Sequence, residues 1–266
     1  MLPELPEVET VVRGLRGPLM GRTFTKVTIL WPGTVKTPSR DLEQALPGQR
    51  IEAITRRAKY LQFHLSSEQT LLIHLKMSGD LLVEPNAEPV HPHVRAIFGL
   101  DNDHQLRFKD MRKFGRIYLV SNPDEVVGNL GPEPLPDDFT VQDFKALFKK
   151  RRGRLKPLLL NQEFIAGIGN IYADESCFIA GIDPRRGVDT LSEAELEKLY
   201  QAIRQALKAG INHKGASLDA VYRGGEFQNH FQVYGRTDEP CYRCGRAIIR
   251  VVLGGRSTHL CTYCQQ

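Results

Sequence analysis

No apolar run in the 266 residues approaches the roughly 20 residues that a membrane-spanning helix needs. We also expect no signal peptide, because the first residues are acidic at Glu4, Glu7 and Glu9 instead of basic. Internal repeats are absent, and a hydrophobic content of 41% excludes a disordered chain. We therefore expect a soluble, intracellular, globular protein, and its length favours two compact units over one.

Cysteine is scarce outside the C-terminus, which excludes a secreted disulfide framework. Of five cysteines, four lie in the last 26 residues, as Cys241, Cys244, Cys261 and Cys264. Two C-x-x-C pairs separated by 16 residues allow four thiolates to converge on one ion, and we predict one structural Zn²⁺ there. Gly245 supplies the positive φ that such a knuckle needs. Two redox C-x-x-C pairs are the less favoured alternative, since no thioredoxin-like strand–helix pattern surrounds them.

Hydrophobic periodicity predicts a helix and then a strand-rich half. The segment Pro6–Leu15 has helical spacing, and we expect its helix to stop at Gly17-Pro18. Short segments in which apolar and polar residues alternate then predict strands, and together these predict a β-sandwich or barrel. They are Phe24–Trp31, Ile51–Ile54, Tyr60–Leu65, Thr70–Met77, Val94–Leu100, Gln105–Lys109 and Arg116–Val120. The proline-rich segment 128–138 ends this run and is the best domain boundary.

Beyond this boundary the pattern turns helical, at 141–150, 155–161, 170–179 and Ser192–Leu207. In the last of these, Ser192 and Glu195 predict a capping box, and Gly210 is expected to end the helix. Cys177 is expected to be a small apolar side chain on a helix face. The tail returns to short strands, at Gln232–Tyr234, Ile248–Leu253 and Thr258–Leu260, with a hairpin turn at Gly254-Gly255.

The positive charge is concentrated in two segments that contain no acid. Seven basic residues lie between Lys145 and Lys156, and four arginines lie between Cys241 and Gln266. One such run is usually a solvated face, but two of them favour a nucleic-acid partner. The glycines of Gly167–Tyr172 can let backbone N–H groups and the Asn170 amide approach a phosphate, with a tight helix junction as the alternative. Arg256, after the hairpin turn, can enter a groove or clamp a phosphate.

A series of motifs runs in order along the whole chain and resembles formamidopyrimidine-DNA glycosylases. The motifs are Pro3–Thr10, Lys59, His74–Gly79, Asp110–Gly115, Leu130–Leu135, Gly167–Tyr172 and the four terminal cysteines. The resemblance implies an α+β multidomain fold with three domains. They are an N-terminal β-sandwich with a flanking helix (1–130), a helix–two-turn–helix domain (131–232) and a C-terminal β-hairpin zinc finger (233–266).

The resemblance also implies an activity, namely base excision repair of damaged double-stranded DNA by a cytoplasmic, nucleoid-associated monomer of the bacterial type. Oxidised purines are removed after the nucleotide is extruded from the stack. Pro3 becomes the nucleophile, because a terminal amine loses its proton far more readily than a lysine side chain, whose pKa is about 10.4. Its Schiff base at C1′ then permits β,δ-elimination. Glu4 protonates the opening sugar, and Lys59 contacts the phosphates and supports catalysis.

The resemblance further implies two kinds of DNA contact. Asn170 and Arg256 hold the phosphates beside the flipped nucleotide. Met77, Arg112 and Phe114 fill the void in the duplex, where Arg112 hydrogen-bonds the orphaned cytosine. Four more residues are predicted to contact DNA, namely His74, His93, Lys156 and Tyr234.

Two segments depart from the family pattern. Leu2 precedes Pro3, whereas the active form in the family begins with proline, and an acylated proline nitrogen cannot form a Schiff base. We expect that Met1-Leu2 is removed or is a start-site artefact. If both residues are retained, the alternative is a catalytically silent protein that binds lesions. A zinc-finger regulator that binds intact duplex DNA is less favoured. The segment Gly215–Phe227 is shorter than the lesion-capping loop of the family. This leaves oxidised pyrimidines, as in the related endonuclease VIII group, as an alternative substrate class.

Overall fold

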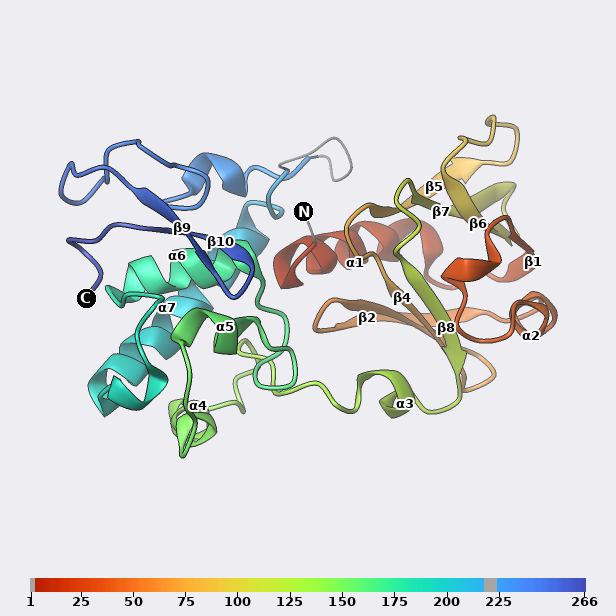
Figure 1. Ribbon diagram of the computed structural model, residues 1–266. Helices are drawn as coiled ribbons and strands as arrows, with labels where there is room; N and C mark the ends of the chain where they lie inside the picture. The colour runs from red at the N-terminus through yellow and green to blue at the C-terminus, as the bar shows by residue number, and fades with distance from the viewer. Residues whose placement is uncertain (1–2, 218–223) are drawn as a thin grey trace. The chain divides into compact units, whose positions relative to one another are not determined.

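The structure, a computed structural model, describes residues 3–217 and 224–266 (Figure 1). These residues form two compact units. The first contains Glu7–Asn129 together with Pro3, Ser217 and Gly224. The second contains Glu4–Pro6, Leu130–Ala216 and Gly225–Gln266, so the start of the chain is shared between the two units.

The first unit is a β-sandwich of two four-stranded antiparallel sheets. One sheet has the order β1 (Phe24–Ile29), β6 (Val94–Leu100), β7 (His104–Asp110), β5 (Gly79–Pro85). The other has the order β2 (Ile51–Arg57), β3 (Tyr60–Leu65), β4 (Thr70–His74), β8 (Arg116–Val120). The helical elements are α1 (Leu5–Leu19), the 3₁₀ turn η1 (Pro32–Thr34), α2 (Ser39–Ala45) and α3 (Asp124–Val127).

One hydrophobic core lies between these elements. Alternate residues of β6 are buried, because successive side chains of a strand point to opposite faces of its sheet. The apolar stripe of α1 enters the same core through Val8, Val12, Leu15 and Leu19. The predicted sandwich is therefore confirmed.

Two details of the first unit differ from the prediction. The first helix does not stop at Gly17-Pro18, since α1 continues through Pro18 to Leu19. Leu19 is completely buried in the sandwich core, so its burial favours the extra residues although Pro18 removes one backbone N–H donor. The strand β5 was not predicted, because Leu81, Leu82 and Val83 form a continuous apolar run instead of an alternating one.

The second unit is mainly helical and carries a β-hairpin. Its elements are α4 (Val141–Phe148), α5 (Leu155–Leu160), α6 (Asn170–Ala180), η2 (Val188–Thr190), α7 (Glu193–Asn212), η3 (Phe227–His230), β9 (Ile249–Leu253) and β10 (Arg256–Leu260). The capping box of Ser192 and Glu195 at the start of α7 is confirmed. Cys177 is buried on α6, as expected. Among the described residues, no helix is long and apolar enough to cross a membrane.

The predicted end of α7 at Gly210 is wrong, because the helix continues to Asn212. A Cβ atom at Gly210 would lie only 2.3 Å from the hydroxyl oxygen of Tyr172, a residue of α6. Gly210 therefore allows α6 and α7 to pack closely and does not end the helix. The hairpin turn at Gly254-Gly255 is confirmed, since both residues have positive φ.

Candidate functional site

The first turn of α6 binds the carboxylate of Glu4. Oε2 of Glu4 accepts hydrogen bonds from the backbone N–H groups of Gly169 (2.7 Å) and Tyr172 (3.4 Å), and Oε1 accepts one from Ile171 (2.9 Å). Such N–H groups have no partner within the helix, and the helix dipole stabilises a negative charge beside them. The glycine-rich loop was expected to present backbone N–H groups to a phosphate. That expectation is wrong for the N–H groups of Gly169, Ile171 and Tyr172, because they donate to the Glu4 carboxylate, which is only 1% exposed.

Two glycines make room for the start of the chain. A Cβ at Gly169 would lie 2.3 Å from Cδ of Glu4, and one at Gly167 would lie 2.6 Å from Cδ1 of Leu5. The backbone N–H of Leu5 also donates to the carbonyl of Gly167 (3.1 Å). Glu4 and Leu5 are thus anchored to the loop before α6, and Pro3 is the residue directly before these anchors.

Asn170 and Tyr234 lie together, although distant parts of the sequence supply them. The Asn170 amide hydrogen-bonds the Tyr234 hydroxyl. Burial raises the pKa of Tyr234, and this hydrogen bond opposes the rise. Oδ1 of Asn170 is buried and has no hydrogen-bond partner among the described residues. The structure therefore brings together two of the predicted DNA-binding side chains.

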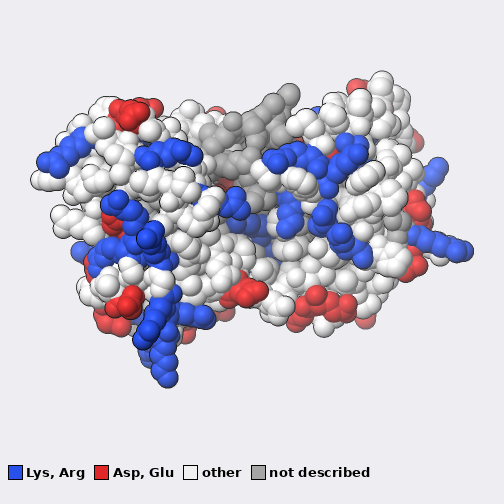
Figure 2. Space-filling view, in the orientation of Figure 1, with Lys and Arg blue, Asp and Glu red and all other residues white. Residues whose placement is uncertain are grey.

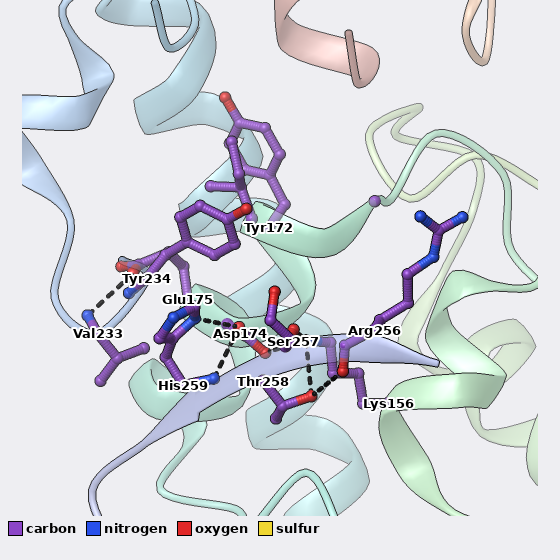
Figure 3. A network of polar contacts seen from close by, with 12 residues as sticks. Lys156, Tyr172, Asp174, Glu175, Val233, Tyr234, Arg256, Ser257, Thr258 and His259 are labelled. Carbon is purple, nitrogen blue, oxygen red and sulfur yellow. Dashed lines mark hydrogen bonds and ion pairs between the residues drawn. The ribbon is translucent and has the colours of Figure 1, made fainter. Parts of the chain in front are cut away.

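A buried ion pair fixes strand β10, from which Arg256 projects (Figure 3). Asp174 of α6 lies 2.6 Å from Nζ of Lys156 and accepts from the backbone N–H of His259 (3.0 Å). Nζ of Lys156 also donates to the carbonyl of Ser257 (2.6 Å) and to the hydroxyl of Thr258 (2.9 Å). In Figure 3 the Arg256 guanidinium points away from this network, and Arg256 is exposed.

The next acid on α6 fixes the segment that carries Tyr234. The carboxylate of Glu175 accepts from the backbone N–H groups of Gln232 (2.9 Å), Val233 (3.0 Å) and Tyr234 (2.9 Å). Burial raises the pKa of Glu175, while these donors oppose the rise. The predicted strand Gln232–Tyr234 is wrong, because a carboxylate and not a neighbouring strand takes these N–H groups.

Lys156 requires a correction. We predicted that it contacts DNA, but its side chain is completely buried and its ammonium group is used by Asp174 and β10. Burial lowers the pKa of Lys156, and the neighbouring Asp174 carboxylate opposes this shift. Lys156 thus acts within the fold, by holding the hairpin, and the acids Asp174 and Glu175 are positioning residues that the sequence interpretation missed.

In the first unit, His74 lies within a cluster of cations. Burial lowers the pKa of His74 to about 3, and the nearby charges of Lys76, Lys59 and Arg116 add to the effect. Nδ1 of His74 accepts from the backbone N–H of Lys76 (2.9 Å), so the neutral ring carries its proton on Nε2. This arrangement offers a neutral donor among cations, which suits a phosphate oxygen. Lys76 and Arg116 were not predicted, although Lys76 lies within the motif His74–Gly79 and Arg116 directly follows the motif Asp110–Gly115.

Buried Asp110 ties together the two segments that carry Met77, Arg112 and Phe114. Its carboxylate accepts from the N–H of Gly115 (2.7 Å) and from the hydroxyl of Ser78, whose oxygen accepts from the N–H of Arg112 (2.9 Å). The guanidinium carbon of Arg112 lies 4.9 Å from the ring centre of Phe114, a side chain that is 44% exposed.

Met77 and His93 lie next to this network. Met77 is half-buried and directly precedes Ser78. The carbonyl of His93 accepts from the backbone N–H of Asp110 (2.8 Å), and its ring contacts Arg95. The segments of His93, Met77 and Arg112 thus meet around Asp110.

The four terminal cysteines lie close enough together to hold one metal ion. Their sulfur atoms all lie within 4.8 Å of one another, with 3.9 Å between Cys241 and Cys264 and 3.5 Å between Cys244 and Cys261. Sulfur ligands at 2.3 Å from a tetrahedral zinc ion are separated by about 3.8 Å, so the cluster fits this ion. Burial raises the pKa of Cys261, but the N–H groups of Cys264 and Tyr263 outweigh it, which lowers that pKa to about 7. Gly245 has the expected positive φ.

The surface charge is unevenly distributed (Figure 2). Lysine and arginine side chains gather on the visible face of each unit, whereas acidic side chains of the first unit lie along its edges. Not every basic residue of the two acid-free segments is available to a ligand. Lys145 pairs with Glu193 and Glu197, and Arg243 donates to the carbonyls of Phe178 and Ile179 at the end of α6.

The chain matches three family descriptions in succession. Residues 2–117 match the formamidopyrimidine-DNA glycosylase N-terminal domain, residues 130–221 the formamidopyrimidine-DNA glycosylase H2TH domain, and residues 238–266 the zinc finger found in FPG and IleRS. It is 45% identical to the formamidopyrimidine-DNA glycosylase of Herpetosiphon aurantiacus over 99% of this chain and 100% of that one. The chain belongs to the formamidopyrimidine-DNA glycosylase family. The glycosylase of Heliobacterium modesticaldum is also 45% identical, over the full length of both chains.

Solved structures agree with this family. The chain superimposes on Lactococcus lactis Fpg in complex with abasic-site DNA with a TM-score of 0.94, at 36% identity and over 99% of both chains. The complex of the same enzyme with DNA containing N7-benzyl-Fapy-dG also gives 0.94, at 36% identity, over 99% of this chain and 100% of that one.

The predicted family and the predicted fold, with its β-sandwich, helix–two-turn–helix region and zinc-finger hairpin, are therefore confirmed. As a member of the formamidopyrimidine-DNA glycosylase family, the chain is an enzyme of DNA repair, of the DNA glycosylase and abasic-site lyase class. The domain boundaries and the roles of the individual site residues stay predictions.

Proposed function

We propose that this glycosylase excises oxidised purines, formamidopyrimidine and 8-oxoguanine among them, and cleaves the abasic site by β,δ-elimination through a Schiff base on Pro3. The observation that carries the proposal is the binding of Glu4 to the first turn of α6, which anchors the residue next to the nucleophile. The Lactococcus lactis enzyme was solved with abasic-site and Fapy-dG DNA, which favours the same substrates here.

In the proposed reaction, the secondary amine of Pro3 attacks C1′ of the extruded nucleotide, and the bond from C1′ to the damaged base breaks. The base leaves with the electron pair of that bond and takes up a proton from water. The Pro3 amine passes its own proton to the Glu4 carboxylate, and the nitrogen lone pair opens the sugar ring between C1′ and O4′, which leaves an iminium at C1′. Glu4 supplies the proton that O4′ takes up. Lys59 lies near His74, and we assign both to the phosphates next to the lesion.

We assign the remaining contacts by position. Asn170, Tyr234 and Arg256 would bind phosphates from the second unit, while Met77, Arg112 and Phe114 would fill the void and His93 would support them. The metal would be one structural Zn²⁺ that keeps the hairpin and Arg256 in place.

For the protein as a whole, we propose a monomer that acts on damaged double-stranded DNA in the bacterial nucleoid and is divided into domains at 130/131 and 232/233. The lesion-capping segment Gly215–Phe227 includes residues 218–223, which lie outside the described residues. The preference for oxidised purines over oxidised pyrimidines therefore rests on the family.

Borohydride reduction tests the nucleophile. Protein whose mass shows Pro3 as its first residue should give a covalent adduct with duplex DNA that contains an oxidised purine, and peptide mapping should locate the adduct on Pro3. The matched control is the same chain with Met1-Leu2 retained, which should give no adduct because its Pro3 nitrogen is an amide. If the chain that starts at Pro3 forms no adduct, the proposal fails and silent lesion binding is favoured. An adduct on Lys59 would reassign the nucleophile, and an adduct only with oxidised pyrimidines would change the substrate class.

A second prediction separates base recognition from phosphate binding. Arg112→Ala should reduce discrimination for the base opposite the lesion by about 1–3 kcal/mol, the value of a bidentate base contact. Asn170→Ala and Arg256→Ala should instead weaken binding to all duplexes alike and flatten its salt dependence, since phosphates carry no sequence information. Excision opposite each of the four bases, at two salt concentrations, measures both effects. An equal loss opposite every base for Arg112→Ala would make Arg112 a backbone contact.

A further inference from the structure

We propose that Trp31 is a positioning residue for recognition of the base opposite the lesion, because it supports the turn that carries Arg112 and Phe114. The inference rests on the proposed role of those two side chains in the void. Trp31 is the only tryptophan of the chain and follows β1, far in sequence from this turn.

The contact between Trp31 and the turn is made by Lys113, the residue between Arg112 and Phe114. Nζ of Lys113 lies 3.9 Å from the centre of the Trp31 ring, a distance at which a cation is attracted to the face of an indole. Lys113 has φ +61°, a left-handed conformation that non-glycine residues rarely adopt and that surrounding contacts must stabilise. The indole ring provides such a contact at the centre of the turn.

The segment that carries Trp31 is itself fixed to both sides of the same turn. The N–H of Trp31 donates to the carbonyl of Arg95 (3.0 Å), and the side chain of Arg95 donates to the carbonyl of Asp110 (2.8 Å). At the other end, the buried hydroxyl of Thr34 donates to the carbonyl of Gly115 (2.9 Å). Trp31 therefore directly precedes the 3₁₀ turn η1, in a segment that is fixed to the residues immediately before and after Met111–Phe114.

Two sets of contacts stabilise the turn, and they act on different parts of it. Asp110 and Ser78 hold its backbone from the protein interior, whereas Trp31 is 39% exposed and acts on its central side chain at the surface. Loss of the ring should therefore leave the turn in place but let Arg112 and Phe114 depart from one orientation. A base contact depends on that orientation, but base excision by Pro3 and Glu4 does not. We therefore expect a variant without the ring to lose selectivity for the base opposite the lesion, while its rate of excision opposite the preferred base stays unchanged.

The experiment compares Trp31→Leu, Trp31→Phe and Lys113→Met, with Lys26→Met on β1 as the control for loss of an exposed positive charge. Excision of an oxidised purine opposite cytosine and opposite adenine is measured for each. Trp31→Leu and Lys113→Met should reduce the preference for cytosine by about two- to fivefold, the effect of losing one exposed cation–π contact, with kcat opposite cytosine unchanged. Trp31→Phe, which keeps an aromatic face, and Lys26→Met should retain the preference.

Fluorescence gives a second readout that does not depend on activity, because all tryptophan emission comes from Trp31. The emission of Lys113→Met should differ from that of the wild type in the free protein, while the emission of Lys26→Met should not. If Trp31→Leu and Lys113→Met keep the wild-type preference while Arg112→Ala loses it, the inference is overturned and the proposed function stands. If Arg112→Ala also keeps the preference, the assignment of Arg112 to the void fails, and the inference about Trp31 fails with it.

Discussion

Lys156→Met should lower the free energy of unfolding of the second unit by about 3–5 kcal/mol, because it leaves a buried carboxylate without its cation. Lys156 and Asp174 are both completely buried and lie 2.6 Å apart. Methionine is apolar and similar in size, so the loss reports the missing charge and not a cavity. Urea denaturation followed by circular dichroism measures the effect, and weaker DNA binding should accompany it, since Lys156 also holds Ser257 and Thr258 next to Arg256.

Two further variants control this experiment. The double variant Lys156→Met, Asp174→Asn should recover most of the lost stability, because no unpaired buried charge is left. Lys145→Met removes a lysine whose partners, Glu193 and Glu197, are exposed, and it should change stability by less than about 0.5 kcal/mol. A loss for Lys156→Met no larger than that for Lys145→Met would contradict the structural role of the buried pair.

The helices and strands that could be predicted are those whose hydrophobic pattern or capping residues lie within the element's own stretch of sequence. The strand β6 alternates between buried and less buried residues, and α7 has both its apolar stripe and its capping box in one stretch of sequence. The prediction failed where tertiary contacts override a local signal. Gly210 was expected to end a helix, but it makes room for Tyr172, and Pro18 was expected to end another, but Leu19 is buried beyond it.

The same distinction separates the predicted from the missed parts of the site. The cysteine cluster is evident from its spacing, because each pair forms its own tight turn. Asp174 and Glu175 occur in α6, where every residue from Ile171 to Phe178 is buried, so no exposed polar face in the sequence marks the two acids. The backbone N–H groups that they accept from lie 57 to 85 residues away. Lys156 was misplaced for the same reason, since it ends a run of exposed basic residues but meets its carboxylate only in the folded unit.

Removal of the metal should unfold the zinc-finger hairpin and weaken DNA binding while the first unit stays folded. The buried core around the cysteines contains few residues, namely Phe178, Val233, Cys241, Ile248 and Cys261. So small a core cannot offset the entropy of ordering the hairpin, and zinc contributes about 10–16 kcal/mol to comparable modules.

Cys244→Ala, or a strong chelator, should therefore release β9 and β10 and with them Arg256, so that DNA binding falls at least as far as in Arg256→Ala. Cys177→Ala is the matched control, since this buried cysteine lies outside the cluster and should leave both the bound metal and DNA binding unchanged. Zinc content by atomic absorption, DNA affinity by fluorescence anisotropy and proteolysis of the hairpin measure the three effects. DNA binding that stays at the wild-type level in Cys244→Ala, with zinc shown to be absent, would mean that Lys156 and Asp174 hold the hairpin without the metal.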